Sequence, residues 1–305
     1  MARCQMMSDR IPWRAGNLWP RLKAQREHGL RTGALQPADT TVEHVNSGGV
    51  RFVVRVLANL SQKEAAIQAQ ARQSKDRTAP VNPFLPYDKD LYVTDISPTH
   101  LCLLNKFNVV NHHFLIVTRQ YEPQENWLTL ADFEALVCCL QAVDGVGFYN
   151  GGPAAGSSQP HKHLQVVPYD GEQVDLSMEK AIASAQLTAG SDQVRMSSLF
   201  PFVHAIAWLE EGAIAQQHLT CYHTLLSAVG IVSQNQWQGQ QTAAYNLLCT
   251  RQWIMIVPRR QERYAGISVN SLGFVGSLLV KDQAMLAKLK EIGPMTLLQQ
   301  VGFSR

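Results

Sequence analysis

Several features that would place this 305-residue sequence in a common class are missing from it. Its six cysteines form no C-x-x-C pair and lie mostly in apolar surroundings, which favours reduced thiols over a disulfide framework or a zinc site. No apolar run is long enough to cross a bilayer. The first residues include Arg3, Arg10 and Arg14 but no uninterrupted apolar segment typical of a signal peptide. We therefore expect a cytoplasmic protein with no membrane partner.

A strong charge imbalance is also absent. The sequence has 27 basic and 24 acidic residues, a net charge of +3, which argues against a dedicated acidic partner such as duplex DNA. We expect no nucleic-acid partner, although local phosphate binding stays open. No fixed-period repeat or long low-complexity tract is present. A chain of this length can bury a substantial core without disulfides or metals, so folding by itself requires no cofactor.

Hydrophobic periodicity predicts a mixture of helices and short strands. Thr129 and Asp132 begin the clearest helix with a capping pair, and its apolar residues follow at helical spacing. Three prolines between residues 75 and 90 predict a long loop. The other predicted elements are helices at 18–30, 61–72 and 214–229, and strands at 50–57, 101–104, 114–118, 146–150, 161–168, 245–249 and 253–257. A polar stretch at 171–195 is the candidate boundary between a region at 1–170 and a region at 196–305.

The most informative segment is the strand predicted at 161–168. In an extended chain, His161, His163 and Gln165 project to one face, while Lys162 and Leu164 project to the other. A half-buried structural strand would normally place apolar residues on one face and solvated charges on the opposite face. Two imidazoles and an amide fit neither, which indicates a functional surface.

The loop before this strand is rich in glycine and serine. Gly151 and Gly156, with Gly152, allow backbone conformations in which successive N–H groups point into one concavity that can bind phosphate oxygens. Ser157 and Ser158 add hydroxyl donors. The loop is not a P-loop, because no lysine follows the second glycine and a strand, not a helix, comes next.

Imidazoles beside a phosphate-binding loop are compatible with two chemistries. In one, His163 attacks phosphorus and forms a covalent phosphoramidate. In the other, the H-x-H pair binds zinc and activates water. Gln165 is a poor zinc ligand and a good donor to a phosphate oxygen, which favours the nucleophile. We therefore assign no metal site to the protein itself.

The segment from Phe148 to Gln165 resembles the H-x-H-x-Q signature of the histidine-triad transferases. It is most similar to the ATP adenylyltransferases, also called diadenosine tetraphosphate phosphorylases. The final glutamine separates these transferases from the histidine-triad hydrolases, which have a third histidine there. The likeness extends to residues 104–118, 245–259 and 268–273. It implies an α+β fold in which helices pack on an antiparallel sheet, with the second half completing the nucleotide site.

The resemblance also implies roles for individual residues. His163 is similar to the nucleophile that takes up AMP, His161 to a partner that orients the site, and Gln165 to the residue that holds a nonbridging oxygen of the intermediate. The implied substrate contacts are Lys63, Asn150, Gly151, Gly156, Ser157, Ser158, Gln159, Asn270 and Ser271.

The reaction implied by the resemblance is phosphorolysis of diadenosine tetraphosphate to ATP and ADP through AMP-histidine. Nucleotides and phosphate are the expected partners, with Mg²⁺ or another divalent ion arriving on the polyphosphate. The oligomeric state is left open, a monomer included. The alternatives are a hexose-1-phosphate uridylyltransferase, an adenylyl sulfate phosphorylase and a nucleotide-binding sensor without turnover.

Some polar residues have simpler interpretations. Arg259, Arg260 and Arg263 could neutralise phosphates, but cations beyond a strand end are ordinarily solvated. Neither His112 nor His113 is assigned to catalysis, because a histidine before a strand commonly makes a local hydrogen bond. The pair Cys138 and Cys139 is interpreted as part of the core.

Overall fold

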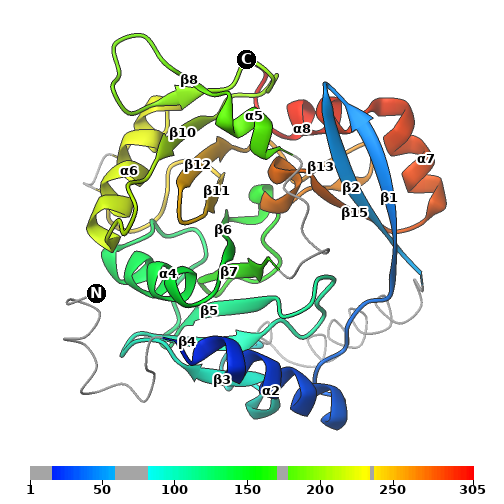
Figure 1. The fold of residues 1–305 in the computed structure, drawn as a ribbon, viewed down its shortest axis with the longest axis vertical. Helices are drawn as coiled ribbons and strands as arrows, with labels where there is room; N and C mark the ends of the chain where they lie inside the picture. Colours follow the sequence, from blue (N-terminus) through cyan, green and yellow to red (C-terminus); the bar gives the residue numbers. More distant parts are fainter. Residues whose placement is uncertain (1–15, 59–81, 170–177, 234–236) are drawn as a thin grey trace.

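A large antiparallel sheet forms the centre of the protein (Figure 1). The computed structural model describes residues 16–58, 82–169, 178–233 and 237–305. Each neighbouring pair of strands in this ten-stranded sheet is antiparallel. In spatial order the strands are β3 (Tyr92–Asp95), β4 (His100–Leu104), β5 (Phe114–Thr118), β7 (His163–Pro168), β6 (Gly145–Gly151), β11 (Tyr245–Cys249), β12 (Trp253–Pro258), β10 (Ala205–Trp208), β9 (Arg195–Met196) and β8 (Gln186–Leu187).

A second, three-stranded sheet combines two strands from the N-terminal part of the chain with one from the C-terminal part. It contains β1 (Thr40–Ser47), β2 (Val50–Leu57) and β15 (Ser277–Val280). The β1–β2 hairpin turns through Gly48 and Gly49, which both have positive φ, as a two-residue turn with right-handed strand twist requires. Strand β15 pairs in parallel with β2, so residues more than 200 positions apart in the sequence share this sheet. The short strands β13 (Arg263–Tyr264) and β14 (Ile267–Ser268) form a separate pair.

Helices cover both sides of the large sheet. The α-helices are α2 (Leu18–Thr32), α4 (Leu130–Ala142), α5 (Glu179–Ala183), α6 (Ala215–Ala228), α7 (Gln283–Ile292) and α8 (Pro294–Val301). The 3-10 helices are η1 (Lys89–Leu91), η2 (Pro153–Ala155) and η3 (Ser271–Val275). None of the helices in the described ranges is long and apolar enough to pass through a membrane.

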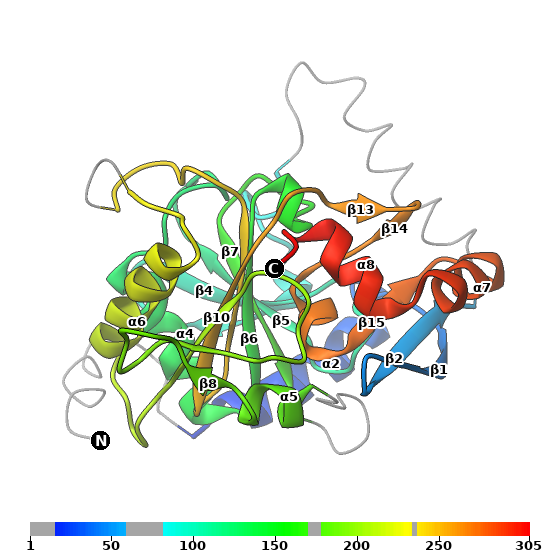
Figure 2. The ribbon, with the colours of Figure 1, turned by 90° about the horizontal axis from the view of Figure 1, so that it is seen from above.

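The two faces of the sheet bury different cores. Helices α2, α4 and α6 pack on the face that carries Leu164 and Val166 of β7. The small sheet, α7 and α8 pack on the opposite face, against Phe148 and Val167. Figure 2 shows α4 and α6 on one side of the sheet and β1, β2 and α7 on the other. His163 and Gln165 alternate with the first set along β7, so they belong to the face covered by the C-terminal elements.

The predicted α+β class is confirmed, and so are most elements. The capping pair of α4 is present, with the Thr129 N–H donating to Asp132 Oδ2 at 2.7 Å. The helix expected at 61–72 lies outside the described residues. Strands from before and after the polar stretch at 171–195 belong to the same large sheet, because β11 pairs with β6. Division of the chain into separate domains at that stretch therefore stays a prediction.

Candidate active site

The site is built on the first residues of β7, in the middle of the large sheet. β7 pairs with β5 on one side, where His163 lies opposite Val117, and with β6 on the other, where Gln165 lies opposite Phe148. His163 is buried and Gln165 half-buried. A strand with neighbours on both sides has little freedom to move, which suits a side chain that must react in a defined direction.

His163 has a single tautomer suited to nucleophilic attack. Its Nδ1–H donates to the carbonyl oxygen of His161 at 2.8 Å. Burial lowers its pKa to about 4, more than the His161 carbonyl raises it, so the ring is neutral near pH 7. Within the described residues, Nε2 has no hydrogen-bond partner. The lone pair of Nε2 is thus available to an electrophile.

A second histidine shows what distinguishes this arrangement from a structural one. His204 is buried, has a pKa lowered by burial to about 4, and donates from Nδ1 to the carbonyl of Phe202 at 2.8 Å. This local geometry matches that of His163 and His161. However, Nε2 of His204 accepts a hydrogen bond from the Ser197 N–H at 2.9 Å. Its lone pair is occupied, so His204 is a core residue.

His161 is held from both sides of its ring. Nε2–H donates to the Thr118 carbonyl at 2.9 Å, and Nδ1 accepts from the Asn82 amide at 2.9 Å. The orientation of the Asn82 amide is fixed, because its oxygen accepts from the Phe84 N–H. Both ring nitrogens of His161 are therefore hydrogen-bonded to protein groups. Its contribution runs through its carbonyl, which orients His163.

Gln165 is oriented by His113, a histidine whose role was not evident from the sequence. His113 donates from Nε2 to Gln165 Oε1 at 3.0 Å, and its Nδ1 accepts from the Asn105 amide at 3.2 Å. Burial lowers the pKa of His113 to about 4, so the ring stays neutral. With its oxygen engaged, the Gln165 NH₂ group has no hydrogen-bond partner among the described residues and is available as a donor. This is the orientation that donates to a phosphate oxygen.

The interpretation of His113 as only a local hydrogen-bonding residue was therefore incomplete. His113 precedes β5, which pairs with β7, and it lies diagonally across from Gln165. The register of β5 against β7 brings the two side chains together. Nothing in the sequence gives that register, because the segments are separated by a helix and a further strand.

We predict that His113 and Gln165 act as one unit. Gln165→Leu should lower kcat about 100-fold, since it removes a donor to the reacting phosphate, and His113→Leu should lower kcat about 10-fold by freeing the amide. The double variant should be no slower than Gln165→Leu alone, which steady-state kinetics would measure. Losses that multiply in the double variant would show that His113 acts independently of Gln165.

The glycine loop lies beside the C-terminal region. Gly152 and Gly156 have positive φ, and a Cβ on Gly156 would lie 2.8 Å from the Val269 carbonyl oxygen. Glycine is therefore required at Gly156 for both its backbone angle and its space. Ser157 is half-buried and Ser158 is exposed. Gly156 thus lies against the segment that joins β14 to η3, where Asn270 is exposed at the beginning of η3.

Asn150 and Ser271, predicted as substrate contacts, belong to a buried polar cluster. Asn150 Oδ1 accepts from Asn246 Nδ2 at 2.9 Å and from the Ser271 hydroxyl at 2.7 Å. Arg259 donates to Asn246 Oδ1 at 2.5 Å and to the Ala155 carbonyl at 3.2 Å. This cluster fixes the glycine loop to the second half of the chain. Contact of Asn150 and Ser271 with a nucleotide stays a prediction.

Arg259 corrects the interpretation of the three arginines as a solvated edge. It is only 3% exposed, whereas Arg260 and Arg263 are exposed. Its guanidinium also donates to the carbonyls of Val269 and Val301. These carbonyls belong to the residue that follows β14 and to the end of α8, and they surround the guanidinium beyond β12, so the cation is hydrogen-bonded inside the protein. Lys63 lies outside the described residues.

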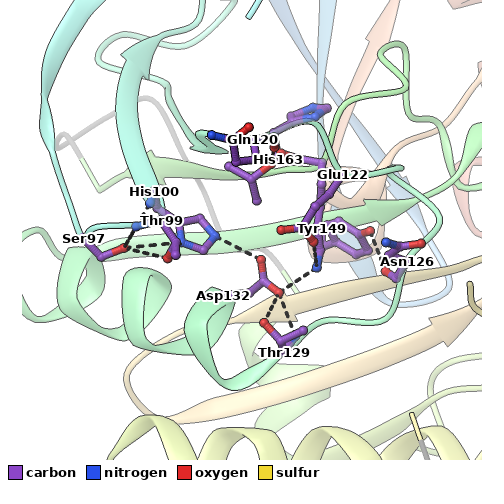
Figure 3. Close-up of polar contacts among 12 residues, drawn as sticks. Ser97, Thr99, His100, Gln120, Glu122, Asn126, Thr129, Asp132, Tyr149 and His163 are labelled. Atoms are coloured by element: carbon purple, nitrogen blue, oxygen red, sulfur yellow. Dashed lines mark hydrogen bonds and ion pairs between the residues drawn. The ribbon is translucent and has the colours of Figure 1, made fainter. Parts of the chain in front are cut away.

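A buried ion pair lies at Lys162, the residue before β7 (Figure 3). Lys162 Nζ lies 2.8 Å from Asp132 Oδ2 and donates to the Trp127 carbonyl at 3.0 Å. Asp132 Oδ1 accepts from His100 Nε2 at 3.1 Å. Lys162 separates His161 from His163 in the sequence. The cluster therefore joins the residue between the two histidines to the first turn of α4.

Taken together, these contacts suit covalent transfer of a phosphate-containing group. A neutral imidazole offers its lone pair, an oriented amide can bind an oxygen on phosphorus, and a glycine loop can surround phosphates. In the described ranges, no group of three or more His, Cys, Asp or Glu side chains could hold a metal ion.

Comparison with known proteins gives the same class. The sequence model of the Ap4A phosphorylase N-terminal domain matches residues 8–184, and that of the ATP adenylyltransferase C-terminal domain matches residues 198–304. Diadenosine 5',5'''-P1,P4-tetraphosphate phosphorylase 2 of Saccharomyces cerevisiae is 30% identical over 252 residues, which cover 74% of this chain and 76% of that protein. Protein APA1 of the same yeast is 30% identical over 205 residues, covering 62% and 64%.

Solved structures share the fold. The crystal structure of yeast Ap4A phosphorylase Apa2 aligns with a TM-score of 0.77 at 24% identity, covering 94% of this chain and 95% of that one. Its complex with AMP gives a TM-score of 0.77 at 25% identity, covering 94% and 97%. The protein is a nucleotidyltransferase. Within that class, the chain belongs to the family of Ap4A phosphorylases and ATP adenylyltransferases.

Proposed function

We propose that the protein catalyses the reversible phosphorolysis of diadenosine tetraphosphate to ATP and ADP. The observation that carries the proposal is the neutral His163 ring, with Nδ1–H bonded to the His161 carbonyl and Nε2 free of hydrogen bonds from the described residues. The family adds the substrate, because its relatives include a yeast diadenosine tetraphosphate phosphorylase.

The first step forms a bond between His163 Nε2 and the α-phosphorus. The bond from that phosphorus to the bridging oxygen breaks, and ATP leaves with the electron pair. The ring that carries AMP becomes positively charged, and the bond from its Nδ1–H to the His161 carbonyl stabilises that charge. The Gln165 amide donates to a nonbridging oxygen as negative charge develops.

The second step reverses the first with a different acceptor. An oxygen of inorganic phosphate attacks the AMP phosphorus, the bond to Nε2 breaks, and ADP is released. A glutamine at position 165 can neither accept nor deliver a proton, so it cannot activate water as a third histidine could. This favours phosphate, already an anion, as acceptor.

A divalent ion such as Mg²⁺ is part of the proposal. It would neutralise charge on the polyphosphate and arrive bound to the substrate. Phosphate as second substrate and a cytoplasmic location also belong to the proposal.

Intact-protein mass spectrometry tests the function directly. The protein is mixed with diadenosine tetraphosphate and Mg²⁺ without phosphate, and we expect a mass gain of one AMP. Addition of phosphate should then remove the adduct and release ADP. A nucleotide-binding sensor would bind the substrate but show neither adduct nor product, and that result would contradict the proposal.

A further inference from the structure

The hydrogen-bond ladder between β6 and β7 ends two residues from the nucleophile His163. The last paired residues are Phe148 and Gln165. Continuing the same register would place His163 opposite Asn150. In that antiparallel pairing, the main-chain groups of His163 that face β6 would bond to those of Asn150. The structure puts a side chain there instead.

The amide of Gln124 occupies this place in the ladder. Gln124 Oε1 accepts from the His163 N–H at 2.8 Å. Gln124 Nε2 donates to the Asn150 carbonyl at 2.9 Å and to the His163 carbonyl at 3.2 Å. A side-chain amide has the same donor and acceptor as a peptide group, so it can satisfy both strands while holding them apart.

Gln124 is itself held firmly. Its side chain is only 2% exposed, and its N–H donates to the Pro160 carbonyl at 2.7 Å. The Tyr149 hydroxyl donates to the main-chain carbonyls of Gln124 and, at 3.1 Å, of Asn126. Figure 3 shows Tyr149 pointing toward Asn126. The segment after β5 is therefore fixed on both sides of the inserted amide.

We propose that Gln124 is a positioning residue, which sets the separation between the nucleophile strand and the strand that leads into the glycine loop. This inference rests on the proposed function, because the separation matters where His163 must meet phosphate held by that loop. Gln124 touches only main-chain atoms of His163 and Asn150, so it is not a catalytic residue. Without its amide, the buried groups would stay unpaired or the two strands would close together. Either change would move His163 Nε2 relative to the glycine loop.

The expected kinetic effect is on kcat. Gln124→Met keeps the volume of the side chain and removes its hydrogen bonds. We expect kcat to fall about 100-fold, as a displacement near 1 Å at a reacting atom does, while KM changes less than about 3-fold. Gln25→Ala is the matched control, because Gln25 on α2 also donates to a main-chain carbonyl, that of Asp90. It should leave kcat unchanged.

A glutamate provides a second test that does not depend on the stability of Gln124→Met. Ionised, Gln124→Glu would face two carbonyl oxygens with no proton to donate, so the variant should be slow. Protonated, its carboxyl group can both accept from His163 and donate to Asn150, as the amide does. Burial favours the protonated form. The kcat of Gln124→Glu should therefore rise at least about 10-fold as pH falls from 8 to 5.5, whereas wild-type kcat stays flat or falls.

The experiments distinguish failure of the inference about Gln124 from failure of the proposed function. Gln124→Met with kcat within 3-fold of wild type, or Gln124→Glu with a wild-type pH profile, would overturn the inference. Should Gln124→Met fail to fold, the pH profile of Gln124→Glu decides. A wild-type protein that forms no AMP adduct would refute the proposed function, which is a different result from normal turnover in both variants.

Discussion

His163→Ala should lower kcat for phosphorolysis by about 10⁵-fold or more, because removing the nucleophile from a covalent enzyme abolishes the intermediate rather than weakening it. No AMP adduct should form in this variant. Both would be measured with diadenosine tetraphosphate, by following ADP release and the intact mass.

The control for this prediction is His204→Ala. His204 has the same local geometry as His163, with its Nδ1–H on the carbonyl two residues before it, but its Nε2 is occupied by the Ser197 N–H. We expect the control to lose stability and to keep the adduct. Adduct formation in His163→Ala, or its loss in a folded His204→Ala, would refute the assignment of the nucleophile.

Asp132→Asn should lower the free energy of unfolding by about 3 to 5 kcal/mol at pH 7, because it removes the buried ionic partner of Lys162 and leaves only the exposed carboxylate of Glu122 at 3.2 Å. Burial alone would raise the pKa of Asp132. However, the hydrogen bond from His100 and the charge of Lys162 outweigh burial and hold the pKa well below its usual range. A lowered folded-state pKa stabilises the protein above the unfolded value near 4, and this contribution is lost as pH falls below it.

Chemical denaturation at several pH values tests this prediction. The stability of Asp132→Asn should fall less between pH 7 and pH 3 than that of the wild type, because the variant has already lost the contribution. Lys290→Met is the control, since Lys290 pairs with Glu43 at the surface at 3.3 Å and both side chains are more than 40% exposed. It should cost less than about 1 kcal/mol. Equal losses in the two variants would mean that burial of the ion pair contributes nothing.

Local sequence was enough to predict most individual elements. The strand at 50–57, the strands at 114–118 and 245–249, and the capped helix at Thr129 are present. Each depends on interactions within a few residues, such as alternation of apolar side chains or a capping hydrogen bond. The placement of His163 and Gln165 on one face of the strand follows from local sequence too, because residues two positions apart in a strand share a face.

The partners of these residues could not be predicted in the same way. His113 meets Gln165, and Gln124 meets His163 and Asn150, through the pairing and register of strands distant in the sequence. Arg259 looked like a surface cation and is buried among carbonyls. Such contacts depend on which long-range pairings form, and sequence patterns specify only which face a residue occupies.

The sequence by itself determined the family of the protein and predicted His163 as the nucleophile with Gln165 beside it, because these features reside in one short segment whose residue types and spacing indicate the chemistry. Only the tertiary structure decided which tautomer His163 adopts, which way the Gln165 amide points and how far apart β6 and β7 lie beside the nucleophile. Those properties are set by hydrogen bonds with His161, His113 and Gln124. A hydrogen bond fixes a proton or an amide only when folding brings donor and acceptor within about 3 Å of each other.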